Sequence, residues 1–140
     1  MSATTSMPQF HSRPEFFLDR SLAGRVADAL RAAGWSVRTH MEVYGGRDED
    51  VEDVEWLELC GREGWIALTK DRRVRYRRYE IAAVRRHRVR AFALASGNLR
   101  AVDQAQSFLA NGAEIVTACS DPGPFIYAVY ADRIERIFPA

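Results

Sequence analysis

The run Trp65-Ile66-Ala67-Leu68-Thr69-Lys70-Asp71 most constrains what this chain can fold into, because a buried-strand pattern of six residues ends there on an aspartate. A dense cluster of guanidinium groups follows at once, formed by Arg72, Arg73, Arg75, Arg77 and Arg78. A second apolar run, at residues 16–18, also ends on an aspartate, Asp19. In a parallel α/β sheet the carboxyl ends of the strands open onto one edge, where ligand crevices form. We therefore expect Asp19 and Asp71 to lie close together.

Predicted strands and helices alternate along the sequence, which is typical of a parallel sheet with right-handed crossovers. The expected strands cover residues 15–18, 35–39, 65–70, 89–95 and 114–118, and a terminal strand pair covers 125–130 and 133–138. The first expected helix runs from a cap at Ser21 to Gly34, and the second from about Asp50–Asp53 to Gly61, after a loop at Tyr44-Gly45-Gly46. Two further helices are expected over residues 79–87 and 99–111. Apolar spacing predicts that these helices turn inward Leu22, Val26, Leu30, Val54, Leu57, Cys60, Ile81, Val84, Val102, Ala105, Phe108 and Leu109. The prediction is one α/β domain over residues 15–140, with a central parallel sheet flanked by helices, after a flexible leader over residues 1–14.

The composition excludes several classes of protein. The chain has 140 residues, of which 47% are hydrophobic and 28% charged, as in ordinary globular domains. No apolar run approaches the roughly 18 residues of a membrane span, and the leader lacks the apolar segment of a signal peptide. Cys60 and Cys119 lack the spacing of a zinc site or a disulfide framework. We expect a cytoplasmic protein without membrane contact.

The net charge of +1 hides a strong segregation of acids from bases. Seven acids fall within residues 48–58, and ten of the twenty basic residues fall within residues 70–90. An acidic block followed by a basic block is what a site needs if it holds cations and a polyanion together. The alternative is two solvated faces of opposite charge that pair with each other.

A third carboxylate joins the two strand-end aspartates in this interpretation. Asp53 lies at the start of a predicted helix, and helices begin at the edge where strands end. Converging carboxylates repel one another unless a cation binds them, and Mg²⁺ prefers carboxylate oxygens together with water and phosphate oxygens. The Arg cluster would hold flanking phosphates, and Trp56, Tyr76 and Tyr79 are candidates for stacking on unpaired bases.

Each of these residues also has a purely structural interpretation. An aspartate between a strand and a helix often forms a turn or a helix cap, and the aromatic residues equally fit a core. The coincidence of Asp19 and Asp71 at equivalent strand ends favours the functional interpretation. Other chemistries have less support, because the histidines His11, His40 and His87 are scattered and no nucleophile-elbow or phosphate-loop motif occurs.

The quoted motifs resemble those of PIN-like domain proteins, and most closely the divergent branch that includes VapC-type toxins of bacterial toxin–antitoxin pairs. The residues that carry the resemblance are Phe16-Phe17-Leu18-Asp19-Arg20, Asp53-Val54-Glu55-Trp56-Leu57 and the run 65–71, with Glu80 beyond. The resemblance covers roughly residues 15–138. It implies a parallel sheet flanked by helices, a Mg²⁺-dependent endoribonuclease site in which Mn²⁺ can substitute, a small antitoxin encoded by a neighbouring gene, and a homodimeric toxin.

Residue by residue, the resemblance assigns catalysis and metal binding to Asp19, Asp53 and Asp71. RNA binding falls to the basic segment, at Arg72, Arg73, Arg75 and Arg78. The family's fourth acidic position, after the next strand, holds Ser96 or Asn98 here, so that a water or one of these side chains would take the place of a carboxylate. Because helix starts are predicted only to within a residue or two, Asp50, Glu52 or Glu55 could replace Asp53.

Two other functions compete with a toxin ribonuclease. A non-catalytic PIN-like module would bind RNA or a protein through the Arg segment, with the acids only balancing charge. A phospho-acceptor receiver domain also places aspartates at strand ends. That class requires an adjacent acid pair after the first strand and a lysine after a late strand, whereas Arg20 follows Asp19 and no lysine follows Lys70.

Overall fold

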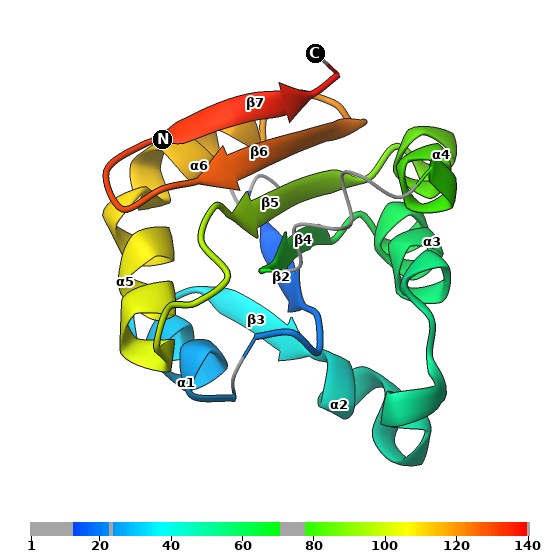
Figure 1. The fold of residues 1–140 in the computed structure, drawn as a ribbon, viewed down its shortest axis with the longest axis horizontal. Coiled ribbons are helices and arrows are strands. Elements are labelled where there is room, and N and C mark those ends of the chain that lie inside the picture. Colours follow the sequence, from blue (N-terminus) through cyan, green and yellow to red (C-terminus); the bar gives the residue numbers. More distant parts are fainter. Residues whose placement is uncertain (1–12, 23, 71–77, 140) are drawn as a thin grey trace, which may run out of the picture.

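A six-stranded sheet with helices on both faces forms the centre of the protein (Figure 1). The structure is a computed structural model that describes residues 13–22, 24–70 and 78–139. The strands lie in the order β3-β2-β4-β5-β6-β7; the first five are parallel, and β7 is antiparallel to β6. Their bounds are β2 (Glu15–Leu18), β3 (Ser36–Thr39), β4 (Ile66–Thr69), β5 (Arg90–Leu94), β6 (Phe125–Val129) and β7 (Ile134–Phe138). The predicted α/β fold with a central parallel sheet is confirmed, and so is the terminal strand pair.

The parallel strands are in a register that brings their carboxyl ends to one edge, called the carboxyl edge below. Leu18 in β2 lies opposite Thr39 in β3 and Leu68 in β4, and Leu68 lies opposite Phe92 in β5. Residues that directly follow these strands therefore meet at the same level of the sheet. Because of this geometry, a ligand-binding site is expected at the carboxyl edge.

Helices cover the sheet in two layers, one on each face. α1 (Gly24–Ala32), α5 (Ala101–Ala110) and α6 (Gly112–Ala118) lie on the left in Figure 1, and α3 (Asp53–Glu63) and α4 (Arg78–His87) on the right. Each layer encloses its own hydrophobic cluster. Phe16 and Leu18 point into the first cluster, while Phe17 between them points into the second, because successive side chains of a strand face opposite ways. Burial on both faces explains why β2, β4 and β5 read as nearly continuous apolar runs.

The contact between α3 and α4 depends on a glycine. A Cβ atom at Gly61 would lie 2.3 Å from the main-chain oxygen of His87, so the two helices approach more closely than any side chain would allow. α3 continues past the predicted end at Gly61 to Glu63, and Gly64 caps it in the left-handed conformation, with φ 75°. The first helix was predicted to end at Gly34, which lies two residues after the end of α1 and has a positive φ of 93°.

The connection predicted before the second helix is regular structure instead. The predicted loop at Tyr44-Gly45-Gly46 is the end of α2 (His40–Tyr44) and the start of the 3₁₀ helix η2 (Gly45–Asp50). Thr39 and Glu42 form a capping box that starts α2, with Thr39 Oγ1 accepting from the Glu42 amide at 3.1 Å. Both helices are too short to show a helical periodicity in the sequence.

The strand predicted over residues 114–118 is wrong, because this segment is helix α6. Its buried residues, Ile115 and Ala118, are three positions apart, which is a helical spacing. β5 pairs directly with β6, as between Leu94 and Val129, so the sheet has no room for a strand between them. A short apolar run does not distinguish the two states without this long-range pairing.

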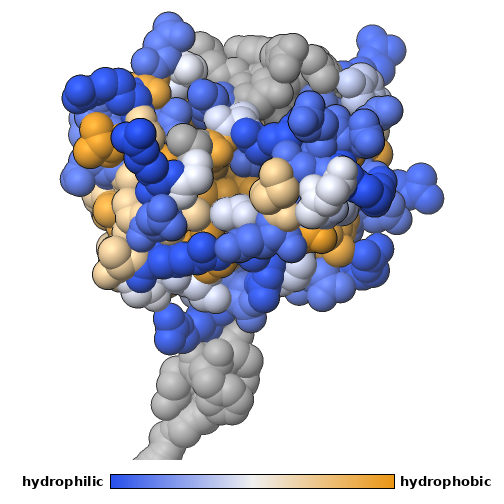
Figure 2. Space-filling model, turned by 90° about the horizontal axis from the view of Figure 1, so that it is seen from below, coloured by the Kyte–Doolittle hydropathy of each residue, from blue (hydrophilic) through white to orange (hydrophobic). Residues whose placement is uncertain are grey.

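One helix face was predicted incorrectly in part. Ala105 and Phe108 of α5 are buried as expected, but Val102 is 63% exposed. Val102 instead lines a groove of about 480 Å³ between α1 and α5, together with Ala29 and Leu109. Figure 2 shows the molecule from below, and hydrophobic residues gather on its left, the side on which α1 and α5 lie in Figure 1. The apolar stripe of α5 is therefore wider than the part of it that the core covers.

No helix within the described ranges is long and apolar enough to cross a membrane. The flexible leader expected over residues 1–14 falls almost entirely outside the described residues.

Candidate active site

Asp19 lies at the carboxyl edge, directly after β2. Its main-chain amide donates to the Leu68 carbonyl at 3.1 Å, which continues the pairing of β2 with β4 by one residue. The Asp19 residue is only 5% exposed. A buried carboxyl group at the end of a central strand needs hydrogen-bond partners, and the neighbouring chain supplies them.

Two hydroxyl groups and one amide hold the Asp19 carboxylate. Ser21 donates to Oδ1 from its hydroxyl and also from its main-chain amide, the latter at 3.0 Å. Thr69, at the end of β4, donates from Oγ1 to Oδ2 at 2.8 Å. The Lys70 amide in turn donates to Ser21 Oγ at 3.1 Å. Ser21 was predicted to cap α1, which begins at Gly24; its hydroxyl is instead part of this network.

Burial raises the pKa of Asp19 to about 6. The hydrogen bonds from Ser21 and Thr69 oppose that shift, because they stabilise the ionised form, and the nearby charge of Asp53 adds to it. The Asp19 carboxyl group is thus held with its acceptor oxygens oriented but at an electrostatic cost. A bound cation would remove that cost.

Asp53 is the first residue of α3 and reaches the carboxyl edge as predicted. Its Oδ1 accepts a hydrogen bond from Trp56 Nε1 at 2.8 Å, which orients the carboxylate. Trp56 itself is 1% exposed and stacks on Phe17, with ring centroids 5.5 Å apart. The hypothesis that Trp56 stacks on unpaired bases is therefore wrong, since its ring belongs to the core.

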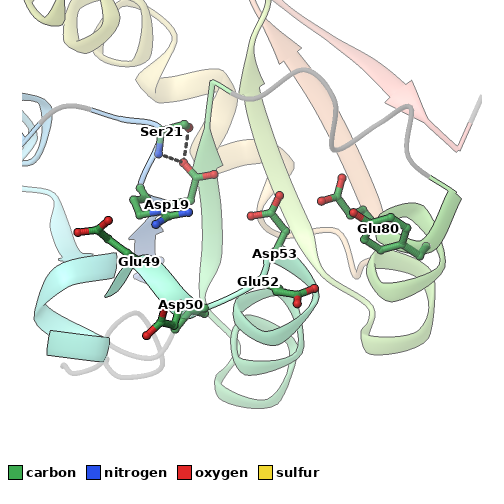
Figure 3. Close-up of a pocket in the computed structure, with 10 residues that line it drawn as sticks. Asp19, Ser21, Glu49, Asp50, Glu52, Asp53 and Glu80 are labelled. Atoms are coloured by element: carbon green, nitrogen blue, oxygen red, sulfur yellow. Dashed lines mark hydrogen bonds between the residues drawn. The ribbon is translucent and has the colours of Figure 1, made fainter. Parts of the chain in front are cut away.

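A pocket of about 380 Å³ opens at the carboxyl edge, and we call it the acidic pocket. Asp19, Asp53 and Glu80 enter it from three elements: the end of β2, the start of α3 and the first turn of α4 (Figure 3). The full set of described lining residues is Asp19, Arg20, Ser21, Glu49, Asp50, Val51, Glu52, Asp53, Tyr79 and Glu80. Six of these ten residues are acidic, so the pocket is built to attract cations.

The sequence-based site omitted three residues that the structure brings to Asp19 or to the pocket. Glu80 is completely buried, and it carried no assigned role although it was part of the quoted motif. An acid in the first turn of a helix that begins at the carboxyl edge is a signal that could have identified it. Ser21 and Thr69 gave no such signal, because a hydroxyl beside an aspartate is recognisable as its partner only once the two strands are aligned.

The remaining predicted site residues are only partly described. Asp71, Arg72, Arg73, Arg75 and the stacking candidate Tyr76 lie outside the described residues. Arg78 is exposed at the start of α4 and is not among the described lining residues. Ser96 and Asn98 lie after β5 and do not line the acidic pocket either, whereas Glu80 does.

The donor chemistry of the acidic pocket fits a hard divalent cation. Its ionisable ligands are carboxylates, and no thiol or imidazole is among the described lining residues. Within the described ranges, however, no three His, Cys, Asp or Glu side chains lie close enough together to hold a metal ion. Mg²⁺ usually binds only one or two carboxylates and keeps several water ligands. The described carboxylates therefore fit Mg²⁺ better than an ion whose ligands all come from the protein.

A comparison with protein families decides the classification. The family model described as a PIN like domain matches residues 14–96, which is more than half of the chain. The chain belongs to the PIN-like domain family. The matched segment of this PIN-like domain runs from the start of β2 through β5, so it contains Asp19, Asp53 and Glu80.

The PIN-like domain also has a curated relative of similar length. It is 35% identical over 123 residues to "Putative ribonuclease VapC45" of Mycobacterium tuberculosis, and the alignment covers 86% of this chain and 89% of the relative. The resemblance to the VapC-type branch is confirmed by this similarity. No solved structure matches the chain.

Proposed function

We propose that this PIN-like domain is a metal-dependent endoribonuclease and the toxin of a toxin–antitoxin pair. The observation that carries the proposal is the buried Asp19, held by Ser21 and Thr69 and facing Asp53 and Glu80 in one pocket. Support for RNA as the substrate comes from the relative, whose name describes a ribonuclease. The reaction is hydrolysis of an RNA phosphodiester bond.

Asp19, Asp53 and Asp71 are the proposed metal ligands and catalytic residues. Asp71 directly follows Lys70, whose amide is bound to Ser21 in the Asp19 network, so the chain leaves the described region beside Asp19. Glu80 supplies a further carboxylate on α4, in place of the acid that is missing after β5. Its position in the first turn of α4 is also where a helix dipole favours an acid.

Mg²⁺, or Mn²⁺ in its place, would supply charge stabilisation at the phosphate and lower the pKa of a bound water. The protein's own contribution is to present ionised carboxylate oxygens in fixed directions. Ser21 and Thr69 orient both oxygens of Asp19, and Trp56 orients Asp53. Such preorganisation is needed because a flexible carboxylate would pay the ordering cost on every binding event.

The proposed substrate and partner rest on the Arg-rich segment of the sequence and on the similarity to a VapC-type protein. Arg72, Arg73, Arg75 and Arg78 are proposed to hold RNA phosphates, which guanidinium groups bind in a forked geometry. Tyr79, which is 54% exposed and lines the pocket, remains a candidate for stacking on an unpaired base. A free nuclease of this kind would harm its host, so we propose a cognate antitoxin from a neighbouring gene, and a homodimeric toxin as in VapC-type pairs.

The proposal is tested with purified protein and unpaired RNA in Mg²⁺, in Mn²⁺ and in EDTA. We expect cleavage with either metal and none in EDTA or with the Asp19→Asn variant. Activity that survives EDTA would contradict the metal-dependent mechanism. Expression of the protein alone and together with the neighbouring gene product tests the toxin–antitoxin part, since growth arrest should occur only in the first case.

The same experiment separates the proposed enzyme from a non-catalytic binding module. If the protein binds RNA and loses that binding when Arg78 and its neighbours are replaced, but cuts no RNA with any metal, the binding module is the better description. The absence of three preformed ligands among the described residues is the observation that keeps this alternative open.

A further inference from the structure

A buried histidine–aspartate pair lies beside the acidic pocket and has no role in the proposed chemistry. His40 Nδ1 and Asp48 Oδ1 are 2.6 Å apart, and the two residues are only 2% and 9% exposed. Register places His40 next to the site: Leu18 lies opposite Thr39, so His40 follows β3 as Asp19 follows β2. A smaller pocket of about 190 Å³ is lined by His40, Asp48, Asp19 and Arg20, and it shares Asp19 and Arg20 with the acidic pocket.

Packing fixes the His40 side of this pair. The His40 ring lies 5.9 Å from the ring of Phe17 and 4.9 Å from that of Tyr44, measured between centroids. The Thr39–Glu42 capping box fixes the main chain where α2 begins. His40 is therefore an anchor that belongs to the sheet and its core.

Asp48, in contrast, belongs to a segment with few other attachments. It is the only buried residue of η2, whose remaining five residues are exposed. Short 3₁₀ helices have poor hydrogen-bond geometry and little stability of their own. The next two residues, Glu49 and Asp50, line the acidic pocket, and buried Val51 leads into α3. The positions of Glu49 and Asp50 at the acidic pocket thus depend on the interactions that hold Asp48.

We propose that His40 and Asp48 are positioning residues, whose hydrogen bond anchors η2 to the end of β3 and so holds Glu49 and Asp50 at the acidic pocket. This inference rests on the proposed function, because it assigns the pair to the proposed cation pocket. Neither residue need touch the metal or the RNA. Outer-shell partners that orient carboxylates typically change metal affinity by about 10–100-fold when they are removed.

Two amide substitutions of His40 test the hydrogen bond itself. The Asn side chain places its amide nitrogen near the position of Nδ1, so His40→Asn can still donate to Asp48. The Gln amide reaches instead toward the position of Nε2, so His40→Gln has similar polarity but loses the bond. Arg47→Ala is the matched control, since it removes an exposed ion pair with Glu55, at 3.1 and 3.2 Å, that also attaches η2 to α3.

The readouts are Mn²⁺ binding, measured from free Mn²⁺ by electron paramagnetic resonance, and amide hydrogen exchange over residues 45–50. Circular dichroism first establishes that each variant is folded. We expect His40→Gln to weaken Mn²⁺ binding about tenfold or more and to speed exchange in η2, and His40→Asn to stay within about threefold of the wild type. Arg47→Ala should change neither readout by more than about twofold, as is usual for an exposed ion pair.

Loss of the proposed metal site and loss of the positioning role of His40 would give different results. A wild-type protein that binds no Mn²⁺ would overturn the proposed metal site, and this inference with it. Wild-type binding with unchanged affinity in folded His40→Gln would overturn the inference alone. If His40→Gln does not fold, Asp48→Ser, whose shorter side chain cannot reach Nδ1, replaces it and carries the same expected loss of affinity.

Discussion

Thr69 and Asp19, fifty positions apart in the sequence, are joined by a hydrogen bond of 2.8 Å from Oγ1 to Oδ2. The bond connects the ends of β4 and β2, two neighbouring strands of the sheet. It therefore holds Asp19, the first candidate ligand, from a second strand. The direction of the Asp19 carboxylate is set by the sheet together with Ser21 in the loop that follows.

Asp19→Asn should abolish RNA cleavage and stabilise the metal-free protein at neutral pH. Burial raises the pKa of Asp19 from 3.8 to about 6, so its contribution to stability is fully present below about pH 4 and is lost as the pH rises through 6. That shift corresponds to about 3 kcal/mol at pH 7.5. Urea unfolding in EDTA should show a higher free energy of unfolding for the variant at pH 7.5 and little difference at pH 4. If the variant and the wild type had equal free energies of unfolding at both pH values, the raised pKa of Asp19 would be contradicted.

Thr69→Val should move the acidic limb of the pH–rate profile to higher pH. The Thr69 hydroxyl lowers the pKa of Asp19, and valine has nearly the same shape without a donor. The shift toward higher pH is measured as cleavage between pH 5 and 8 at a fixed, limiting Mg²⁺ concentration. Thr69→Ser keeps the donor and serves as the control, with a profile close to that of the wild type. A profile of Thr69→Val that coincides with the wild type would show that the bond does not tune Asp19.

Glu80→Gln should raise the Mg²⁺ concentration needed for half-maximal cleavage by about tenfold or more, as removal of a carboxylate that contacts or orients a metal site commonly does. The substitution keeps the size of the side chain, so the fold should persist. Glu58→Gln, at an exposed position of α3, is the matched control and should leave the metal dependence unchanged. If both variants respond to Mg²⁺ alike, Glu80 is a core residue and not part of the site.

Asp71→Asn should remove growth arrest while leaving a folded protein, as judged by circular dichroism at equal expression. The proposed role of Asp71 requires a negative charge, which asparagine lacks. Asparagine caps turns and helices nearly as well as aspartate does, so a purely structural role would survive the substitution. Continued arrest of growth by Asp71→Asn would therefore remove this residue from the proposed site.

Gly61→Ala should destabilise the protein by about 1–3 kcal/mol or more, because a methyl group would meet the main chain of His87 and the two helices would have to separate. Gly46→Ala is the control, since a Cβ atom there meets nothing within 4 Å. Thermal unfolding of the two variants measures the difference. Similar melting temperatures for the two variants would mean that α3 and α4 can move apart without a loss of stability.

Six of the seven predicted strands and the position of Asp19 followed from the sequence for a simple reason. A strand buried on both faces must be apolar at every position, as residues 16–18 and 66–68 are, so its end is visible where the first charged residue appears. Parallel strands then bring those ends to one edge whatever the connections contain. Asp19 and Asp53 could be assigned to the same edge on this basis, although their grouping around a metal remains a prediction.

The tertiary structure alone decided the features that depend on contacts between distant segments. Residues 112–118 became a helix because the direct pairing of β5 with β6 leaves no place for a strand. Val102 stayed exposed because none of the described elements covers its side of α5. Glu80 reached the pocket because α4 packs on α3, and His40 met Asp48 because η2 folds back onto the end of β3. For residues 112–118 the local sequence does not decide, because a short apolar run fits a helix and a strand alike. The free energy that chooses between them comes from burial and hydrogen bonding to residues far away in the chain.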